Sequence, residues 1–207
     1  MPLKIGVLAS GRGTNLQAII NAIEAGTLPA RIAVVISNYP GVPALERAAR
    51  HGAPTVVIER GGFGSRSAHQ QAIADELQRR DVELVVLGGF DRVVEPEILR
   101  AFTDRVINIH PSLLPAFGGG LHAQADALEC GVKVSGCTVH FVTEEVDAGP
   151  IIAQACVPVL EDDTAETLAA RILEQEHRIL PEAILLFAQG RLRIEGRRVR
   201  VLPERSA

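Results

Sequence analysis

Apolar stretches of strand length alternate with segments of helical periodicity through the first half of the chain. The strand-like stretches cover residues 3–9, 32–37, 55–58, 82–88 and 105–109. Helical spacing of apolar positions covers residues 15–25, 44–51 and 67–80, and a short helix is expected after Pro96. This alternation predicts βαβ units with right-handed crossovers, and therefore an α/β fold with a mostly parallel, twisted sheet and helices on both faces.

The pattern changes in the second half of the chain. Residues 134–142 and 150–159 are extended segments on either side of an acidic loop at 143–149. We therefore expect an added strand pair at this point rather than another crossover.

A long helix is expected after the strand pair, from about Thr164 towards Gln189. Asp163 is its predicted N-cap, with Glu166 three residues on, at the spacing from which a carboxylate reaches back to the cap. Pro181 should kink or split this helix, because proline removes one backbone hydrogen bond and clashes with the preceding turn.

Length and composition limit the possible classes of protein. The chain has 207 residues, of which 47% are apolar and 22% charged, and it contains no repeat or low-complexity tract, so we expect a single domain over residues 1–207. A formal charge of −4 gives no general attraction to nucleic acid or to an anionic membrane. Residues 191–205 are the exception, with six arginines interrupted by two glutamates. A solvated terminal hairpin or tail explains them better than a binding site.

The cysteines and the N-terminus bear on the compartment. Cys130, Cys137 and Cys156 are an odd number without C-x-x-C spacing, which argues against a disulfide framework and a zinc cluster. No charged leader follows Met1, and no apolar stretch reaches the roughly 18 residues of a membrane span. The expectation is a cytoplasmic protein.

A glycine-containing loop, Ser-Gly-Arg-Gly-Thr-Asn at residues 10–15, joins the first strand directly to a helix. Glycines allow close approach of the backbone to a ligand, and the free N–H groups of a first helical turn favour an anion such as a phosphate monoester. The loop lacks the Lys-Ser/Thr of a P-loop, and Leu16 stands where a third glycine would complete a dinucleotide fingerprint. A tight structural turn remains the alternative to a phosphate site.

The most informative segment runs from Asn108 to Pro115. Residues two apart in a strand share a face, so Asn108 and His110 should point the same way at the end of the fifth strand, and Pro111 holds His110 extended. An amide donor beside an imidazole suits a tetrahedral oxyanion and proton transfer to a leaving nitrogen. A packed or solvated histidine is the alternative.

Asp147 lies in a loop that could fold back over the same strand ends. A carboxylate there would raise the pKa of a nearby imidazole from about 6.5 and keep part of it protonated at neutral pH. The alternative is that Asp147 only turns the chain before Gly149. A metal site at His110, His122 and His140 is not expected, because no H-x-x-x-H helix or cysteine accompanies these histidines.

Three motifs, in this order, together resemble one family. They are Asn-Ile-His-Pro-Ser-Leu-Leu-Pro at 108–115, Gly-Cys-Thr-Val-His-Phe-Val at 136–142 and Asp-Ala-Gly-Pro-Ile-Ile at 147–152. With the loop at 10–15 and Gln-Glu-His at 175–177, the chain resembles the glycinamide ribonucleotide formyltransferase family from near residue 3 to about residue 190.

The resemblance implies a Rossmann-like formyltransferase fold with a nucleotide-binding half at 1–110, a folate-binding and catalytic half at 111–190 and a tail at 191–207. The implied activity is direct transfer of a formyl group from 10-formyltetrahydrofolate, the cosubstrate, to the amine of 5'-phosphoribosylglycinamide in purine biosynthesis. No covalent enzyme intermediate and no metal are expected. A monomer or homodimer would act on these small molecules, without nucleic acid or membrane partners.

The resemblance also assigns roles to individual residues. His110 would be the general acid, Asn108 an oxyanion donor and folate contact, and Asp147 the group that orients His110. The substrate phosphate would be held by Gly13, Thr14 and Asn15, with Glu176 near the glycinamide end. The folate would be bordered by Arg66, Asp91, Arg92, Val93 and Val94.

Two positions depart from the family pattern. Asp91 stands where many members have an apolar residue, so its carboxylate could alter folate contacts. The loop at 116–121 is unusually rich in glycine, which leaves the placement of His122 open.

Other functions remain as alternatives. Methionyl-tRNA formyltransferases and formyltetrahydrofolate hydrolases share this chemistry but carry further domains, for which the chain is expected to have no room. A non-catalytic or nicotinamide-binding Rossmann domain is a different class. The missing third glycine and the absence of an acidic ribose partner after the second strand, which ends in Ser37-Asn38, argue against it.

Overall fold

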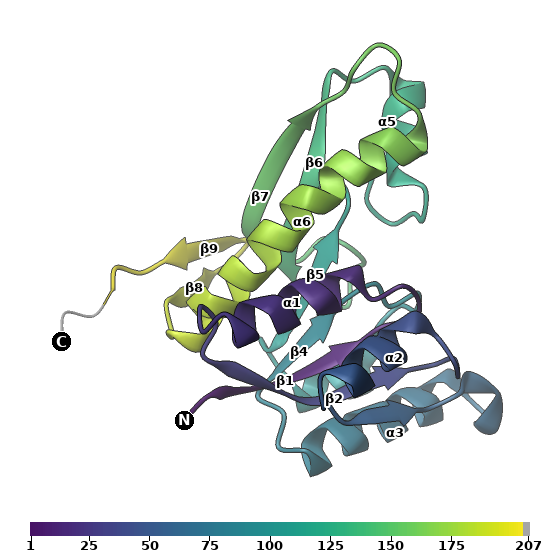
Figure 1. The fold of residues 1–207 in the computed structure, drawn as a ribbon, viewed down its shortest axis with the longest axis vertical. Helices are drawn as coiled ribbons and strands as arrows, with labels where there is room; N and C mark the ends of the chain where they lie inside the picture. Colours follow the sequence, from purple (N-terminus) through teal and green to yellow (C-terminus); the bar gives the residue numbers. More distant parts are fainter. Residues whose placement is uncertain (205–207) are drawn as a thin grey trace. The chain divides into compact units, whose positions relative to one another are not determined.

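The computed structural model describes residues 1–204 and divides the chain into two compact units, Met1–Asn108 and Ile109–Ala207. The first unit contains the alternating part of the chain (Figure 1). Its strands are β1 (Leu3–Leu8), β2 (Ala30–Ser37), β3 (Thr55–Val57), β4 (Leu84–Leu87) and most of β5 (Val106–His110). Its helices are α1 (Thr14–Glu24), α2 (Pro43–Arg50), η1 (Arg60–Gly62), α3 (Arg66–Arg79) and α4 (Pro96–Ala101).

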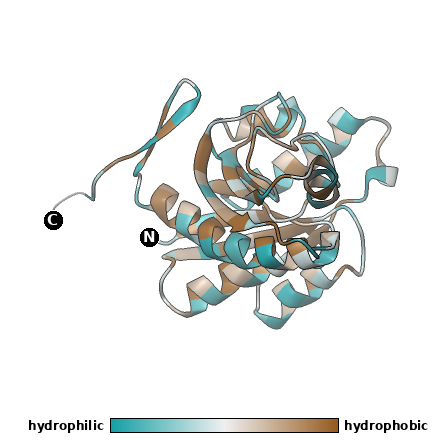
Figure 2. Ribbon diagram, turned by 90° about the horizontal axis from the view of Figure 1, so that it is seen from above, coloured by the Kyte–Doolittle hydropathy of each residue, from teal (hydrophilic) through white to brown (hydrophobic). Residues whose placement is uncertain are grey.

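These five strands lie in the order β3-β2-β1-β4-β5, and every pairing among them is parallel. The predicted βαβ alternation is therefore confirmed, as is a mostly parallel sheet with helices on both faces. The centre of the sheet is fully buried, with Ile5, Val7, Val85 and Val86 at 0% exposure. Figure 2 shows mostly hydrophobic residues along the strands of the sheet, whereas the helices carry both hydrophobic and hydrophilic residues. Burial on both faces explains why these strands are almost continuously apolar.

The second unit carries the remaining elements, which are α5 (Ala123–Cys130), β6 (Val134–Phe141), β7 (Ile151–Pro158), α6 (Ala165–Ala188), β8 (Leu192–Glu195) and β9 (Arg198–Val201). β6 and β7 are antiparallel neighbours, as the predicted strand pair requires. β8 and β9 form an antiparallel hairpin, and β9 meets β7 at one parallel position. A hairpin therefore lies within the predicted tail at residues 192–201, and residues 205–207 lie outside the described part of the chain.

The predicted cap of the long helix was wrong by one residue. Thr164 is the N-cap, and its side chain accepts from the backbone N–H of Thr167, whose hydroxyl accepts from Thr164 N–H. Asp163 instead accepts from Leu160 N–H and holds Arg171 through two hydrogen bonds. The hydroxyls of Thr164 and Thr167 therefore make the reciprocal capping bonds that the sequence predicted for Asp163 and Glu166.

Pro181 does not split α6, which is one continuous helix of 24 residues. An internal proline costs a helix about 3 kcal/mol. The turns around it bury Ile179, Leu180, Ala183 and Ile184, and burying one large aliphatic side chain returns roughly 1.5–3 kcal/mol. Packing therefore outweighs the lost hydrogen bond.

Candidate active site

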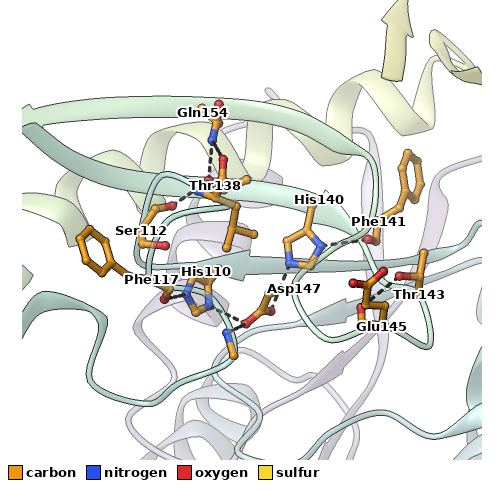
Figure 3. Close-up of polar contacts among 12 residues, drawn as sticks. His110, Ser112, Phe117, Thr138, His140, Phe141, Thr143, Glu145, Asp147 and Gln154 are labelled. Atoms are coloured by element: carbon orange, nitrogen blue, oxygen red, sulfur yellow. Dashed lines mark hydrogen bonds and ion pairs between the residues drawn. The ribbon is translucent and has the colours of Figure 1, made fainter. Parts of the chain in front are cut away.

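His110 is the last residue of β5, and its imidazole is held at both nitrogens by groups of the second unit. Nε2 lies 3.0 Å from the carbonyl oxygen of Phe117, and Nδ1 lies 3.4 Å from Oδ2 of Asp147 (Figure 3). Because a carbonyl oxygen only accepts, Nε2 carries a hydrogen. The side chain is 8% exposed. The ring therefore has a defined orientation, with Nδ1 towards the carboxylate.

Asp147 is an ionised carboxylate at the centre of this cluster. Its Oδ2 accepts from the backbone N–H of Gly119 at 2.8 Å, and its Oδ1 lies 3.6 Å from Nε2 of His140. The hydrogen bond with His140 lowers the pKa of Asp147 to about 2, helped by Gly119 N–H and by the charge of His110, while burial opposes the change. The carboxylate thus stays negative at neutral pH and can orient His110.

His140 is a site residue that the sequence interpretation missed, because it was considered only as a metal ligand. It is 1% exposed, and its Nδ1 lies 2.9 Å from the carbonyl oxygen of Phe141. Asp147 therefore lies between two imidazoles, each of which uses its other nitrogen on a backbone carbonyl. This arrangement holds the Asp147 carboxylate in place beside His110.

A second hydrogen-bonded group fixes the chain just after His110. Thr138 Oγ1 donates to the Ser112 carbonyl at 2.7 Å and accepts from Leu114 N–H and from Gln154 Nε2, both at 3.0 Å. Gln154 also donates to the Leu114 carbonyl. All bonding positions of this buried hydroxyl are used. Strands β6 and β7 thereby hold the segment that carries the site.

The glycine-rich loop 116–121 closes around the same groups. Phe117 has a positive φ of 56° and presents its carbonyl to His110. A Cβ on Gly118 would lie 2.9 Å from the Leu114 side chain and 3.3 Å from Cβ of Asp147. Close packing at Gly118 lets the next residue, Gly119, donate its N–H to Asp147. Close packing at Gly118 and the hydrogen bond from Gly119 to Asp147 therefore explain the glycines at these two positions.

Asn108 lies two residues before His110 in β5, so strand geometry gives the two side chains the same face. Asn108 belongs to the first unit and pairs with Leu87 of β4. Its side chain is of intermediate exposure. The joint role of Asn108 and His110 stays a prediction.

The residues predicted to hold a phosphate form the start of α1 in the first unit. Gly13 is the N-cap with φ 68°, and Thr14 and Asn15 are the first helical residues. A Cβ on Gly13 would lie 2.7 Å from Cα of Ala44, so both backbone conformation and space require glycine here. Helix α2 braces the loop, because Ala44 N–H donates to the Gly11 carbonyl and Arg47 donates to the Arg12 carbonyl. The first helical turn therefore presents backbone N–H groups in a rigid loop.

The residues predicted to border the folate also lie in the first unit. Arg66 is the exposed first residue of α3, and Asp91, Arg92, Val93 and Val94 follow β4. Val94 is 5% exposed, whereas Val93 is 59% exposed. Exposed apolar surface beside a charged arginine suits a flat aromatic ligand with polar edges.

Glu176, predicted to lie near the glycinamide, is a 7% exposed carboxylate on α6 in the second unit. Cys137 of β6 is fully buried, and burial together with the charge of Glu176 raises its pKa to about 12. Cys137 is therefore a core thiol that stays protonated at neutral pH. Among residues 1–204, no group of three or more histidine, cysteine or acidic side chains could hold a metal ion.

The comparisons with known proteins agree over most of the chain. Residues 3–184 match the family model described as formyl transferase. The chain is 45% identical over 192 residues to phosphoribosylglycinamide formyltransferase of Haemophilus influenzae. The aligned region covers 93% of this chain and 90% of that relative. It is 47% identical to the trifunctional purine biosynthetic protein adenosine-3 of Gallus gallus, but spans only 19% of that longer protein.

Solved structures give the same result. Glycinamide ribonucleotide transformylase 1 from Symbiobacterium toebii is 57% identical, with a TM-score of 0.96 over 98% of this chain and 95% of that one. A formyltetrahydrofolate deformylase from Pseudomonas syringae pv. tomato has a TM-score of 0.91 at 26% identity, and the match covers 67% of that chain. By sequence and by structure, this chain belongs to the formyl transferase family, in which it groups with the phosphoribosylglycinamide formyltransferases.

Proposed function

We propose that this protein transfers the formyl group of 10-formyltetrahydrofolate to the amine of 5'-phosphoribosylglycinamide, giving formylglycinamide ribonucleotide and tetrahydrofolate in purine biosynthesis. The observation that carries the proposal is the buried His110 beside the ionised Asp147, at the end of the strand that also contains Asn108. A donor amide and an imidazole that can become cationic are what formyl transfer between two nitrogens needs.

The acceptor's phosphate is assigned to Gly13, Thr14 and Asn15 at the start of α1. The helix dipole at this N-terminus favours an anion by roughly 0.3–1 kcal/mol. Glu176 is assigned to the glycinamide end, where a carboxylate would attract a primary amine. The folate is assigned to Arg66 and the loop from Asp91 to Val94.

The proposed reaction needs no covalent enzyme intermediate. The amine nitrogen attacks the formyl carbon, a C–N bond forms and the carbonyl electrons move to oxygen. Asn108 donates a hydrogen bond to this oxyanion. The intermediate then expels N10 of the folate, to which His110 gives a proton as the C–N10 bond breaks, while the attacking nitrogen loses one proton to solvent.

The proton on His110 Nε2 is donated to the Phe117 carbonyl in this structure. Delivery of that proton to substrate therefore requires Nε2 to exchange Phe117 for the leaving nitrogen. Asp147 keeps Nδ1 as the second contact during the exchange, so the ring stays oriented.

The decisive experiment compares formyl acceptors. The purified protein with 10-formyltetrahydrofolate should produce tetrahydrofolate only when phosphoribosylglycinamide is added, as followed by absorbance or chromatography. Equal release of formate in water alone would identify a hydrolase instead. Tight NADH binding without any response to folate would contradict both readings.

Three variants test the assigned roles in the same assay. His110→Ala and Asp147→Asn should lower kcat strongly while barely changing the Kd for phosphoribosylglycinamide. Asn108→Ala should raise the barrier by about 3 kcal/mol, because one oxyanion donor is lost. Near-normal turnover in any one variant would refute the role of that residue.

The assembly and the compartment remain expectations. We propose a monomer or homodimer in the cytoplasm that acts on these small molecules. Within residues 1–204, no helix combines the length and apolar character needed to cross a membrane.

A further inference from the structure

A hydrogen-bonded cluster joins three loops at the carboxyl ends of the parallel strands in the first unit. It is made of Ser10 after β1, Asn38 and Tyr39 after β2, and Asp91 and Arg92 after β4. None of these contacts belongs to the acid–base pair of the second unit. The cluster is therefore a separate feature, which the sequence interpretation did not detect.

The carboxylate of Asp91 uses both of its oxygens within the cluster. Oδ1 accepts from Asn38 Nδ2 at 2.9 Å, and Oδ2 accepts from the hydroxyl of Tyr39 at 2.9 Å. Burial opposes ionisation of Asp91, but the hydrogen bonds from Asn38, Tyr39 and Ser10, with the charge of Arg92, outweigh it and lower its pKa. Asp91 is thus an ionised acceptor that ties the loop after β4 to the loop after β2.

Arg92 is held by the same tyrosine. Its guanidinium donates from an η nitrogen to the Tyr39 hydroxyl at 2.9 Å and lies 6.0 Å from the centre of the Tyr39 ring. The Tyr39 hydroxyl therefore donates to one residue and accepts from the next residue of the same loop. Removing this oxygen would take one hydrogen bond from Asp91 and one from Arg92.

Ser10 closes the cluster on the side of the phosphate loop. Its hydroxyl donates to Asn38 Oδ1 at 2.6 Å and accepts from the backbone N–H of Asp91 at 3.0 Å. Its backbone N–H donates to the Gly89 carbonyl at 2.9 Å. The first residue of the phosphate loop is thus bonded to both ends of the segment 89–91.

We propose that Asp91 is a positioning residue for the folate: with Tyr39 and Asn38 it fixes the loop 88–94 and the direction of Arg92, so that this loop is ordered before the folate binds. This rests on the proposed function, because the loop is assigned to the folate there. Pre-organisation of a binding loop lowers the ordering cost of binding and so improves affinity without changing the chemical step.

The test is a double-mutant cycle with Asp91→Ala and Tyr39→Phe. Each single variant should raise the KM for 10-formyltetrahydrofolate, and the Kd for the product tetrahydrofolate by calorimetry, by about three- to tenfold, because each removes hydrogen bonds of ordinary net strength. The kcat should change by less than about twofold. The double variant should be no weaker than about the worse single variant, because both changes release the same loop.

Asp75→Ala is the matched control, since Asp75 is an exposed carboxylate of the same unit bonded to Gln71 on its own helix. It should leave both constants unchanged. Tyr39→Phe keeps the ring beneath Arg92, so it remains informative if Asp91→Ala folds poorly. If the wild type is active, an unchanged KM for 10-formyltetrahydrofolate and an unchanged Kd for tetrahydrofolate in both single variants would overturn the inference. Affinity losses that multiply in the double variant, or a fall in kcat alone, would also overturn it. Wild-type protein without transferase activity would instead overturn the proposed function.

Discussion

At the scale of single residues, two imidazoles rather than one lower the pKa of the Asp147 carboxyl. His140 supplies the leading contribution to its lowered pKa, and His110 a smaller one. Because His140 is 1% exposed and bonded to the Phe141 carbonyl, it cannot turn away without leaving buried polar groups unpaired. His140 is therefore a positioning residue for Asp147.

The variant His140→Gln tests this role. Loss of the imidazole should raise the pKa of Asp147 towards its ordinary value and reduce the orientation of His110. We expect kcat to fall on the order of tenfold, which corresponds to one weakened hydrogen bond to a charged group. His51→Gln, at an exposed histidine paired with Glu24, serves as the control. Equal kcat values in the two variants would show that His140 is only a core residue.

The sequence could predict some of the site residues but not others. His110 could be predicted, because it ends a strand and precedes a proline, and Asp147 because its loop can return to that edge. His140 could not, since it lies between Val139 and Phe141 in a buried strand and looks like core. The available signal was its register: it shares a face of β6 with Thr138, which bonds the segment after His110.

At the scale of elements, the loop 116–121 requires glycine at position 118 because a side chain there would clash with its neighbours, not because of the backbone conformation. A Cβ there would meet Leu114 and Asp147, whereas one on Gly120 would meet only Asp126 at an ordinary 3.8 Å. Gly118→Ala should therefore displace the loop, weaken the hydrogen bond from Gly119 to Asp147 and lower kcat by about tenfold. The kcat of Gly120→Ala should stay within about twofold of the wild-type value. Steady-state kinetics on the two variants distinguish these results, and equal activity would contradict the packing argument.

Most elements followed from periodicity, and the failures have physical causes. Strands β1, β2, β4 and β5 and helix α1 were predictable because each buries several large apolar side chains. Helix α5 was missed because its eight residues carry few large apolar side chains and only Ala123 and Ala127 are buried. The cap of α6 was misassigned because Asp163 and Thr164 are both good caps, and only tertiary contact with Arg171 decides between them.

At the scale of the whole molecule, the two units carry different parts of the proposed chemistry. The first holds the loop at the start of α1 and the cluster around Asp91, and the second holds His110, His140 and Asp147. The family resemblance implied a single domain with a functional boundary at residue 110, and that division of function stays a prediction. Local patterns could not reveal that ionised, hydrogen-bonded carboxylates recur in both units, because the partners lie far away along the chain.

These carboxylates make the stability of the molecule sensitive to acid. The pKa of Asp147 falls from its ordinary 3.8 to about 2 on folding, which corresponds to about 2 kcal/mol. Because the folded pKa is the lower one, this contribution is complete above about pH 4 and is lost as pH falls towards about 2. Asp163, held by Arg171, shifts in the same direction.

Urea unfolding between pH 6 and pH 2 should therefore show a steeper loss of unfolding free energy in the wild type than in Asp147→Asn. The variant should be less stable at pH 6, because the asparagine cannot carry the charge that the two histidines stabilise. Its difference from the wild type should shrink by about 2 kcal/mol on acidification, because the protonated wild-type carboxyl gives up the same interaction. Parallel pH profiles would mean that the carboxylate has the same pKa in the folded and unfolded chain, and that its contacts with His110 and His140 contribute nothing to folding.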